Sequence, residues 1–152
     1  MRVHLLRNRR GFTIIEALVV MSILGVVATF AVPAFERTML ANKLDRATVV
    51  AAADLQNAFT LAARQRKPVR VTVDGAGRSI EIYDRTTGAL LTMRRYGATT
   101  SAYGLTSLSI ANPVIVFPTG IASGTTTVTL RLGQHQRRIT MSRVGQIRIQ
   151  VL

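Results

Sequence analysis

The order of apolar and polar residues divides the chain into three stretches. From Phe12 to Phe35 nearly every residue is apolar, and Glu16 is the one charge among them. From there to about Arg66, apolar residues recur at steps of three or four, which predicts an amphipathic helix. From Val69 onward apolar and polar residues alternate, which predicts strands. The pattern therefore predicts one long N-terminal helix followed by a β-rich part.

The amphipathic stretch, 36–66, continues the apolar helix and carries a stripe of small side chains. Because alanine lets a sheet approach closely, we expect the β-rich head to pack on this stripe. Asp45 and Asp54 are expected on the other, polar positions, and Lys67 ends the helix because a residue before proline is pushed out of the helical region. The stripe consists of Leu40, Leu44, Ala47, Ala51, Leu55, Ala58 and Ala62.

The β-rich part, 67–152, contains seven alternating runs. The segment Asp74–Gly77 between the first two is typical of a hairpin turn, whereas 97–112 is rich in Thr, Ser, Gly and Ala and is predicted to be a loop. In the last run, Ile147, Ile149 and Val151 are expected to face the core. The fold class is thus α+β, a long helix packed on an antiparallel sheet, with strands at 69–73, 79–83, 90–95, 114–117, 126–132, 138–142 and 146–151.

The apolar stretch, 12–35, is long enough to span a membrane, since a helix needs about 20 residues to cross the hydrocarbon layer. Four arginines precede it, and a basic flank stays in the cytoplasm. This predicts a single pass with the C-terminal part outside. A cleavable signal peptide, a plain anchor and a buried core helix are the alternatives. The apolar run is long for a signal peptide, and the remaining residues are too few to enclose a core helix. The four arginines are Arg2, Arg7, Arg9 and Arg10.

Glu16 is costly inside such a span. An ionisable residue in a transmembrane helix costs about 2.5–3.5 kcal/mol on insertion scales. No basic residue lies within the span to neutralise it. Its partner is therefore expected from another chain or from a new chain end.

The residues around Glu16 resemble a known family. The run Arg-Arg-Gly-Phe-Thr-Ile-Ile-Glu-Ala-Leu, residues 9–18, looks like the leader junction of type IV pilins and type II secretion pseudopilins. The resemblance implies that a prepilin peptidase removes the leader, 1–11, by cutting between Gly11 and Phe12. It also implies that Phe12 becomes N-methylated, and that Glu16 pairs with the terminal amine of a neighbouring subunit in a filament.

The C-terminal part resembles one branch of that family, the minor pseudopilin GspH with its pilus relatives FimT and FimU. Residues 84–112 have no counterpart in this resemblance. In the closing element, Gln146 replaces an arginine that the branch more often has. The matching runs are Phe117-Pro118-Thr119-Gly120, Val128-Thr129-Leu130, Arg138-Ile139-Thr140-Met141 and Gly145-Gln146-Ile147-Arg148.

The charge is strongly positive, with 20 basic against 7 acidic residues and a net charge of +13. Loss of the leader arginines leaves 16 basic and 7 acidic residues, or +9, and no acid follows Asp84. Some C-terminal arginines alternate with apolar residues and should project from the sheet, while others should lie in turns. This predicts a basic patch near the tip of the head, built from Arg131, Arg138 and Arg148 on strands and Arg137 and Arg143 in turns.

Arginine binds phosphate or carboxylate through its planar set of donors, so DNA and acidic proteins are both candidate ligands for this patch. FimT-type pilins are associated with DNA capture through a basic C-terminal region. The patch lacks the aromatic residues that stack bases, and Gln146 removes one arginine. Contact with acidic neighbouring subunits, or plain solvation, is therefore favoured over DNA.

No enzymatic site is expected. The chain has no cysteine, and its two histidines, His4 and His135, each stand alone. No nucleophile and base pair up, and neither a cofactor nor a metal is predicted.

The resemblance implies a minor pseudopilin that helps a type II secretion system export folded proteins. Its expected partners are a prepilin peptidase, other major and minor pseudopilins, the bacterial inner membrane and secreted proteins. A minor type IV pilin for pilus assembly or DNA uptake is the first alternative. A membrane-anchored binding domain without a filament is the second.

Overall fold

The computed structural model describes residues 11–97 and 101–152. In these residues it has one helix and eight strands, which fall into two compact units divided between Arg37 and Thr38. The helix α1 crosses that boundary. The elements are α1 (Ile14–Gln65), β1 (Val69–Asp74), β2 (Ser79–Asp84), β3 (Leu90–Arg95), β4 (Ser107–Ile110), β5 (Val114–Val116), β6 (Thr126–Leu132), β7 (His135–Met141) and β8 (Ile147–Val151).

The first unit consists of the N-terminal half of α1. Its length and apolar composition are sufficient for a membrane span, and α1 continues through Pro33 without a break. The Ser22 hydroxyl donates to the Leu18 carbonyl at 2.8 Å, and the Thr29 hydroxyl donates to the Gly25 carbonyl at 3.0 Å. Both polar side chains are therefore satisfied within their own helix, as an apolar environment requires.

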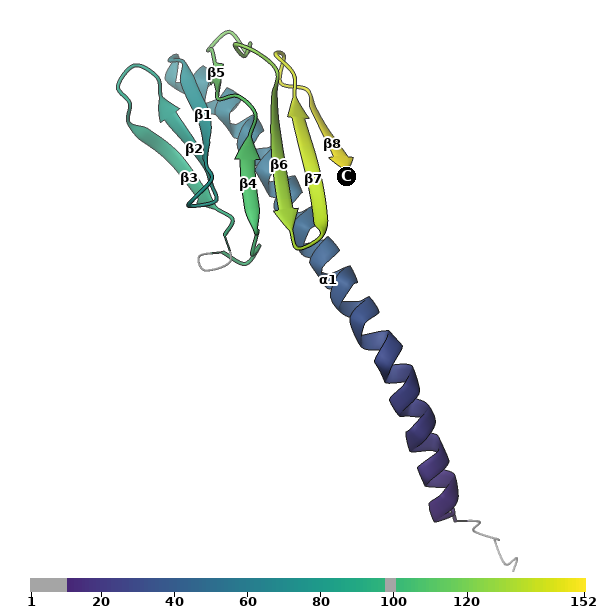
Figure 1. Cartoon of the computed structure of the whole chain (residues 1–152). Coiled ribbons are helices and arrows are strands. Elements are labelled where there is room, and N and C mark those ends of the chain that lie inside the picture. The colour runs from purple at the N-terminus through teal and green to yellow at the C-terminus, as the bar shows by residue number, and fades with distance from the viewer. Residues whose placement is uncertain (1–10, 98–100) are drawn as a thin grey trace, which may run out of the picture. The chain divides into compact units, whose positions relative to one another are not determined.

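The second unit, which we call the head, packs two four-stranded sheets beside the C-terminal half of α1 (Figure 1). The first sheet has the order β3-β2-β1-β5 and the second has the order β4-β6-β7-β8. All strand pairs in both sheets are antiparallel. The α+β prediction is confirmed, but the strands form two sheets where one was expected.

The predicted loop at 97–112 is wrong in part, because β4 lies within it. Leu108 of β4 is 2% exposed and lies opposite Leu130 of β6. The run Ser-Leu-Ser-Ile is short and half polar, so its alternation was hard to distinguish from loop composition. Pairing with β6, about twenty residues further along the chain, makes it a strand.

The stripe on α1 forms one wall of the head's core, as predicted. Six of its seven residues are fully buried, and only Leu40, at 36%, is exposed. Residues from both sheets complete the core, among them Val71, Ile82, Leu130 and Ile139. The stripe therefore holds both sheets.

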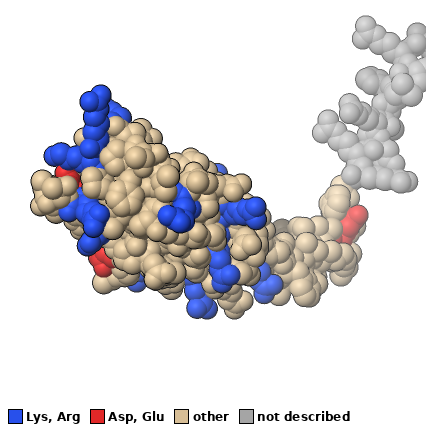
Figure 2. Space-filling view, turned by 90° about the horizontal axis from the view of Figure 1, so that it is seen from above, with Lys and Arg blue, Asp and Glu red and all other residues tan. Residues whose placement is uncertain are grey.

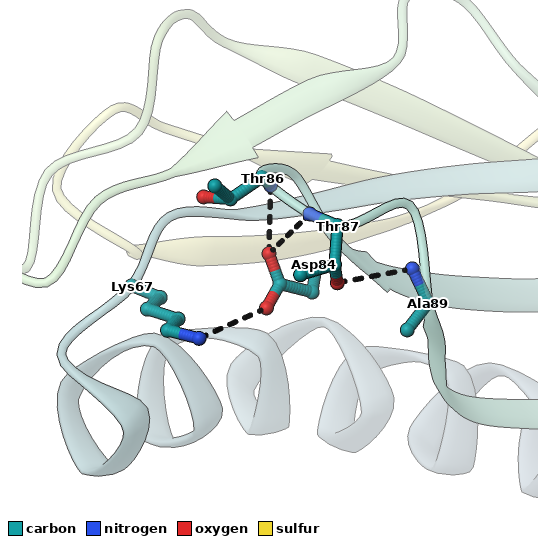
Figure 3. A network of polar contacts seen from close by, with 5 residues as sticks. All are labelled: Lys67, Asp84, Thr86, Thr87 and Ala89. Carbon is teal, nitrogen blue, oxygen red and sulfur yellow. Dashed lines mark hydrogen bonds and ion pairs between the residues drawn. The ribbon is translucent and has the colours of Figure 1, made fainter.

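A polar network fixes the chain where α1 gives way to β1 (Figure 3). Asp84, at the end of β2, accepts hydrogen bonds from the N–H groups of Thr86 at 2.7 Å and Thr87 at 3.2 Å. Lys67 lies 3.8 Å from the same carboxylate. The Thr86 N–H is the largest influence on this group and lowers the pKa of Asp84, against the opposing effect of burial. The turn after β2 is thereby tied to the end of the helix.

Candidate functional site

Thr13 caps the N-terminus of α1. Its hydroxyl oxygen accepts the N–H of Glu16 at 3.2 Å, and its carbonyl accepts the N–H of Ala17 at 3.1 Å. Thr13 and Glu16 thus occupy the two key positions of a capping box, in which a threonine and a glutamate three residues later secure a helix start. Sequence analysis missed this signal, although the Thr-x-x-Glu spacing is visible in the chain.

The carboxylate of Glu16 is exposed, and no ion pair in the described part of the chain involves it. An acid in the first turn is favoured by the helix dipole, a contribution of about 0.3–1 kcal/mol. That is smaller than the cost of an uncompensated carboxylate in lipid. The cap and the helix dipole therefore offset only part of the free-energy cost of a charge at this position.

The junction and the apolar half of α1 are fully accessible. Gly11 and Phe12 directly precede the helix and are exposed, as is every residue from there to Leu40. A continuous apolar surface of this size is uncommon on a soluble monomer and marks a membrane or protein contact. The most exposed of its large apolar side chains are Phe12, Ile14, Ile15, Met21, Val26, Phe30 and Phe35.

The outer face of the second sheet forms a regular grid without acids. Register places Ser109, Thr129, Arg138 and Gln150 side by side across the four strands. Adjacent rows are Ser107, Arg131 and Gln136 on one side, and Thr127, Thr140 and Arg148 on the other. Figure 2, which views the molecule from above, shows many basic and few acidic side chains on that side of the head. We call these three rows the basic sheet face.

Three predicted arginines lie on this face. Arg131, Arg138 and Arg148 are all exposed, and each sits on a different strand and in a different row. They therefore run diagonally along the sheet. Arg143 lies in the turn between β7 and β8, as expected.

Arg137 departs from its predicted place in a turn. It lies inside β7, on the inner face beside Ile139, and is 8% exposed. Its Nε donates to Oδ1 of Asp45 on α1 at 2.7 Å. The strand β7 begins at His135, three residues earlier than expected, so the turn has already ended before Arg137. Arg137 thus pins the sheet to the helix and is not part of the basic sheet face.

Asp54 is a buried acid, although the sequence pattern assigned it to the polar side of α1. It is 5% exposed and accepts two hydrogen bonds from Nε of Arg94, at 2.7 and 3.0 Å, and one from the Tyr96 hydroxyl at 2.7 Å. Burial and the Asp54 carboxylate raise the pKa of Tyr96 far above its ordinary value. The hydrogen bond to Asp54 raises the pKa of Arg94. This cluster joins β3 to the helix.

In the described ranges, 11–97 and 101–152, no three His, Cys, Asp or Glu side chains come together in a way that could hold a metal ion. The Glu16 carboxylate and the basic sheet face are two exposed polar features of the described residues. Both suit contacts with other macromolecules.

Comparison with known proteins agrees with this picture. Residues 6–32 match the family described as the prokaryotic N-terminal methylation motif. No curated protein matches the chain by sequence.

Solved structures share the fold. The type IV minor pilin FimU of Pseudomonas aeruginosa strain PAO1 matches in one crystal form with a TM-score of 0.56 at 19% identity, covering 72% of this chain and 90% of FimU. A second crystal form of FimU matches with a TM-score of 0.54 at 17% identity, covering 70% of this chain and 92% of FimU. The minor pseudopilin EpsH from the type 2 secretion system of Vibrio cholerae matches with a TM-score of 0.50 at 14% identity, covering 72% of this chain and 97% of EpsH.

The motif and the fold together define a type IV pilin-like protein. Within that class, its head has the GspH/FimT-like fold found in minor pilins and minor pseudopilins. The motif implies processing by a prepilin peptidase and assembly with other pilin-like subunits, and the apolar N-terminal helix fits an anchor in the inner membrane.

Proposed function

We propose that this chain is a minor pseudopilin of a type II secretion system, anchored by residues 12–35 in the inner membrane with its head in the periplasm. Its role is structural and not enzymatic: it joins the pseudopilus that helps export folded proteins. The observation that carries this proposal is the exposed apolar stretch 12–35, which starts directly behind Gly11 and bears one acid, Glu16.

Glu16 sets the register of the subunit. Cleavage after Gly11 creates an amine on Phe12, and the Glu16 carboxylate of one subunit pairs with that amine on its neighbour. A buried charge alone is costly, whereas two opposite charges buried together offset one another. The Thr13 cap holds the first turn in shape and so defines the helix position from which the Glu16 side chain projects.

Replacements at two positions separate the pairing role from the capping role. Glu16→Gln keeps a residue that suits the capping box but has no charge, and Glu16→Ala removes both functions. Thr13→Ala removes the cap and keeps the charge. If pairing governs assembly, both Glu16 variants lose incorporation into filaments while Thr13→Ala retains most of it. Crosslinking of epitope-tagged subunits in sheared filaments measures incorporation.

Mass spectrometry of the mature N-terminus is the control, since all three variants should still be cut after Gly11 and methylated on Phe12. Normal incorporation of Glu16→Gln together with failure of Thr13→Ala would assign Glu16 to capping alone. A mature chain that starts at Met1 would remove the filament proposal altogether.

The fold is shared with both FimU and EpsH. The choice of a secretion system over a pilus is therefore supported by the closing run Gly-Gln-Ile-Arg, which lacks one arginine of the pilus-associated pattern. Deletion of the gene tests this choice. We expect the deletion to leave exported enzymes in the periplasm, with twitching and transformation unchanged. Loss of twitching or transformation with intact export would assign the chain to a pilus.

DNA uptake by a minor pilin is the second candidate, and the acid-free basic sheet face favours it. DNA binding through arginine would weaken steeply with salt because counterions are released. Retardation of duplex DNA by the full chain in detergent micelles, across a salt series, measures this. Binding that falls with salt and is reduced by Arg138→Gln supports DNA contact, and absence of binding at low salt removes it.

A further inference from the structure

The strand β8 is an open edge of the second sheet. It pairs with β7 on one side, and no strand in the described part of the chain pairs with its other side. It is regular over its five residues, Ile147–Val151, and lies near the end of the chain. Such an edge offers a row of free backbone groups to another extended segment.

The register shows which backbone groups are free. The N–H of Leu152 donates to the Gln136 carbonyl at 3.3 Å, and the N–H of Ser142 donates to the Gln146 carbonyl at 2.9 Å. In an antiparallel pair, every second residue bonds to the partner strand. The even-numbered residues of β8 therefore bond to β7, while Ile147, Ile149 and Val151 direct their N–H and C=O groups away from it.

The apolar side chains of the same three residues lie on the inner face of the sheet. On the neighbouring strand β7, the side chains opposite them on that face are buried. Ile149 is 47% exposed and lies opposite Ile139, which is fully buried. Val151 is 72% exposed and lies opposite Arg137. Only Ile147 packs partly against the core. The core side of β8 is thus uncovered, contrary to the expectation that all three would be core residues.

The outer side of β8 is basic. Arg148 and Gln150 belong to the basic sheet face, Arg138 lies directly beside Gln150 on β7, and no acid lies on that face. Neighbouring strands in a sheet are about 4.8 Å apart. A carboxylate on the outer side of an added strand would therefore reach Arg148.

We propose that β8 is a docking edge for an extended segment of another protein, which adds as an antiparallel strand. The segment alternates apolar residues, which cover Ile149 and Val151 on the inner side, with acidic residues, which face Arg148 on the outer side. Backbone bonds supply affinity and the alternate side chains supply specificity, as in other strand additions. A second copy of β8 fits poorly, since it would bring another arginine to the same face.

The other accessible edges are less suited. The pairing between the edge strand β3 and its neighbour β2 shifts register between Ile82 and Tyr83. Such an irregularity increases the local twist, which turns an edge away from partners. The edge strand β5 is covered by the segment after it, since Val116 pairs with Ala122 and the Ile115 N–H donates to the Ser123 hydroxyl at 3.0 Å. The edge strand β4 has only four residues and lies against β1. This leaves β8 as the edge strand in regular register, with Ile149 and Val151 exposed.

The proposal goes beyond the proposed function, and it is tested with the full chain in detergent micelles. The probe is a capped seven-residue peptide that alternates Val and Glu. In an added antiparallel strand, the Val N–H groups would face β8 and the Glu N–H groups would face solvent. N-methylation of the Val residues should weaken binding by at least about tenfold, whereas N-methylation of the Glu residues should leave it nearly unchanged.

Two substitutions on β8 give a matched pair. Ile149→Lys places a charge on the inner side and should weaken binding by at least about tenfold. Gln150→Lys places the same charge one residue away on the outer side and should leave binding equal or tighter. If Ile149→Lys lowers the unfolding temperature of the head, Val151→Lys, at a more exposed position, takes its place.

Amide exchange identifies the edge directly. In the free chain, the N–H groups of Ile149 and Val151 should exchange fast and those of Arg148 and Gln150 slowly, and the peptide should slow the first pair. Equal binding by both lysine variants, or by a Val–Lys peptide, would overturn the proposal. So would slow exchange at Ile149 without peptide, which would mean that β8 is already paired. The mature N-terminus is measured separately, so failure here leaves the pilin proposal standing.

Discussion

The two halves of α1 form one helix but differ in how far their side chains are buried. In the first half, residues 14–37, every side chain is exposed although most are apolar. In the second half, residues 38–65, eight side chains are buried, and two of these, Thr48 and Asp54, are polar. The second half packs against two sheets of its own unit.

The comparison teaches that helix formation and burial have separate causes. Local backbone bonding and capping are enough to form both halves. The second half obtains its partner from its own chain, because its small side chains admit the sheets. The first half needs a partner from outside, either lipid or other subunits, because a bare apolar surface is unfavourable in water.

Truncating a leucine in each half gives the largest expected difference. Leu55 is fully buried in the head and Leu24 is 55% exposed in the first half. Leu55→Ala should destabilise the head by about 2–5 kcal/mol, while Leu24→Ala should change it by less than about 0.5 kcal/mol. Urea denaturation of the full chain in micelles measures both. Equal midpoints for the two variants would contradict the division of the helix.

Introducing an arginine into each half tests which half enters the membrane. Ile23→Arg should cost about 2.5–3.5 kcal/mol of insertion free energy and release a large share of the protein from membranes. Asn57→Arg, on an exposed position of the second half, should have no such effect. Alkaline extraction of cell membranes measures retention. Full retention of Ile23→Arg would indicate that the first half is not a span.

Removing the Tyr96 hydroxyl tests the polar cluster that only the second half possesses. Tyr96→Phe loses the hydrogen bond to Asp54 and should destabilise the head by about 1.5–3 kcal/mol at neutral pH.

The pH dependence of this effect follows from the raised pKa of Tyr96. Its contribution to stability is fully present below about pH 10, the ordinary tyrosine value, and is lost as the pH rises further. The stability gap between wild type and Tyr96→Phe should therefore narrow above about pH 10. Urea midpoints at pH 7 and above pH 10 measure it, with Tyr83 and Tyr103 common to both chains. A constant gap would mean that Tyr96 is not held in its neutral form.

Much of the head followed from sequence alone, and the failures share one cause. The hairpin of β1 and β2 and the strands β3 and β6 lie where alternation predicted them. The strand β4 was missed because its partner β6 lies far along the chain. Asp54 and Arg137 were placed on polar surfaces because their partners, Tyr96 and Asp45, come from distant elements. Alternation also placed Ile149 and Val151 on the inner side of β8, where no strand of the described residues pairs with the free edge to cover them.

The sequence by itself determined the N-terminal motif, the apolar stretch 12–35, the isolated Glu16 and the helix stripe. These features are local, since each depends on residues within a few turns of one another. Only the tertiary structure decided that the strands form two sheets, which charged side chains are buried, and that β8 ends the second sheet as an open edge. Those features depend on pairings between distant segments, which the order of residues along the chain does not display.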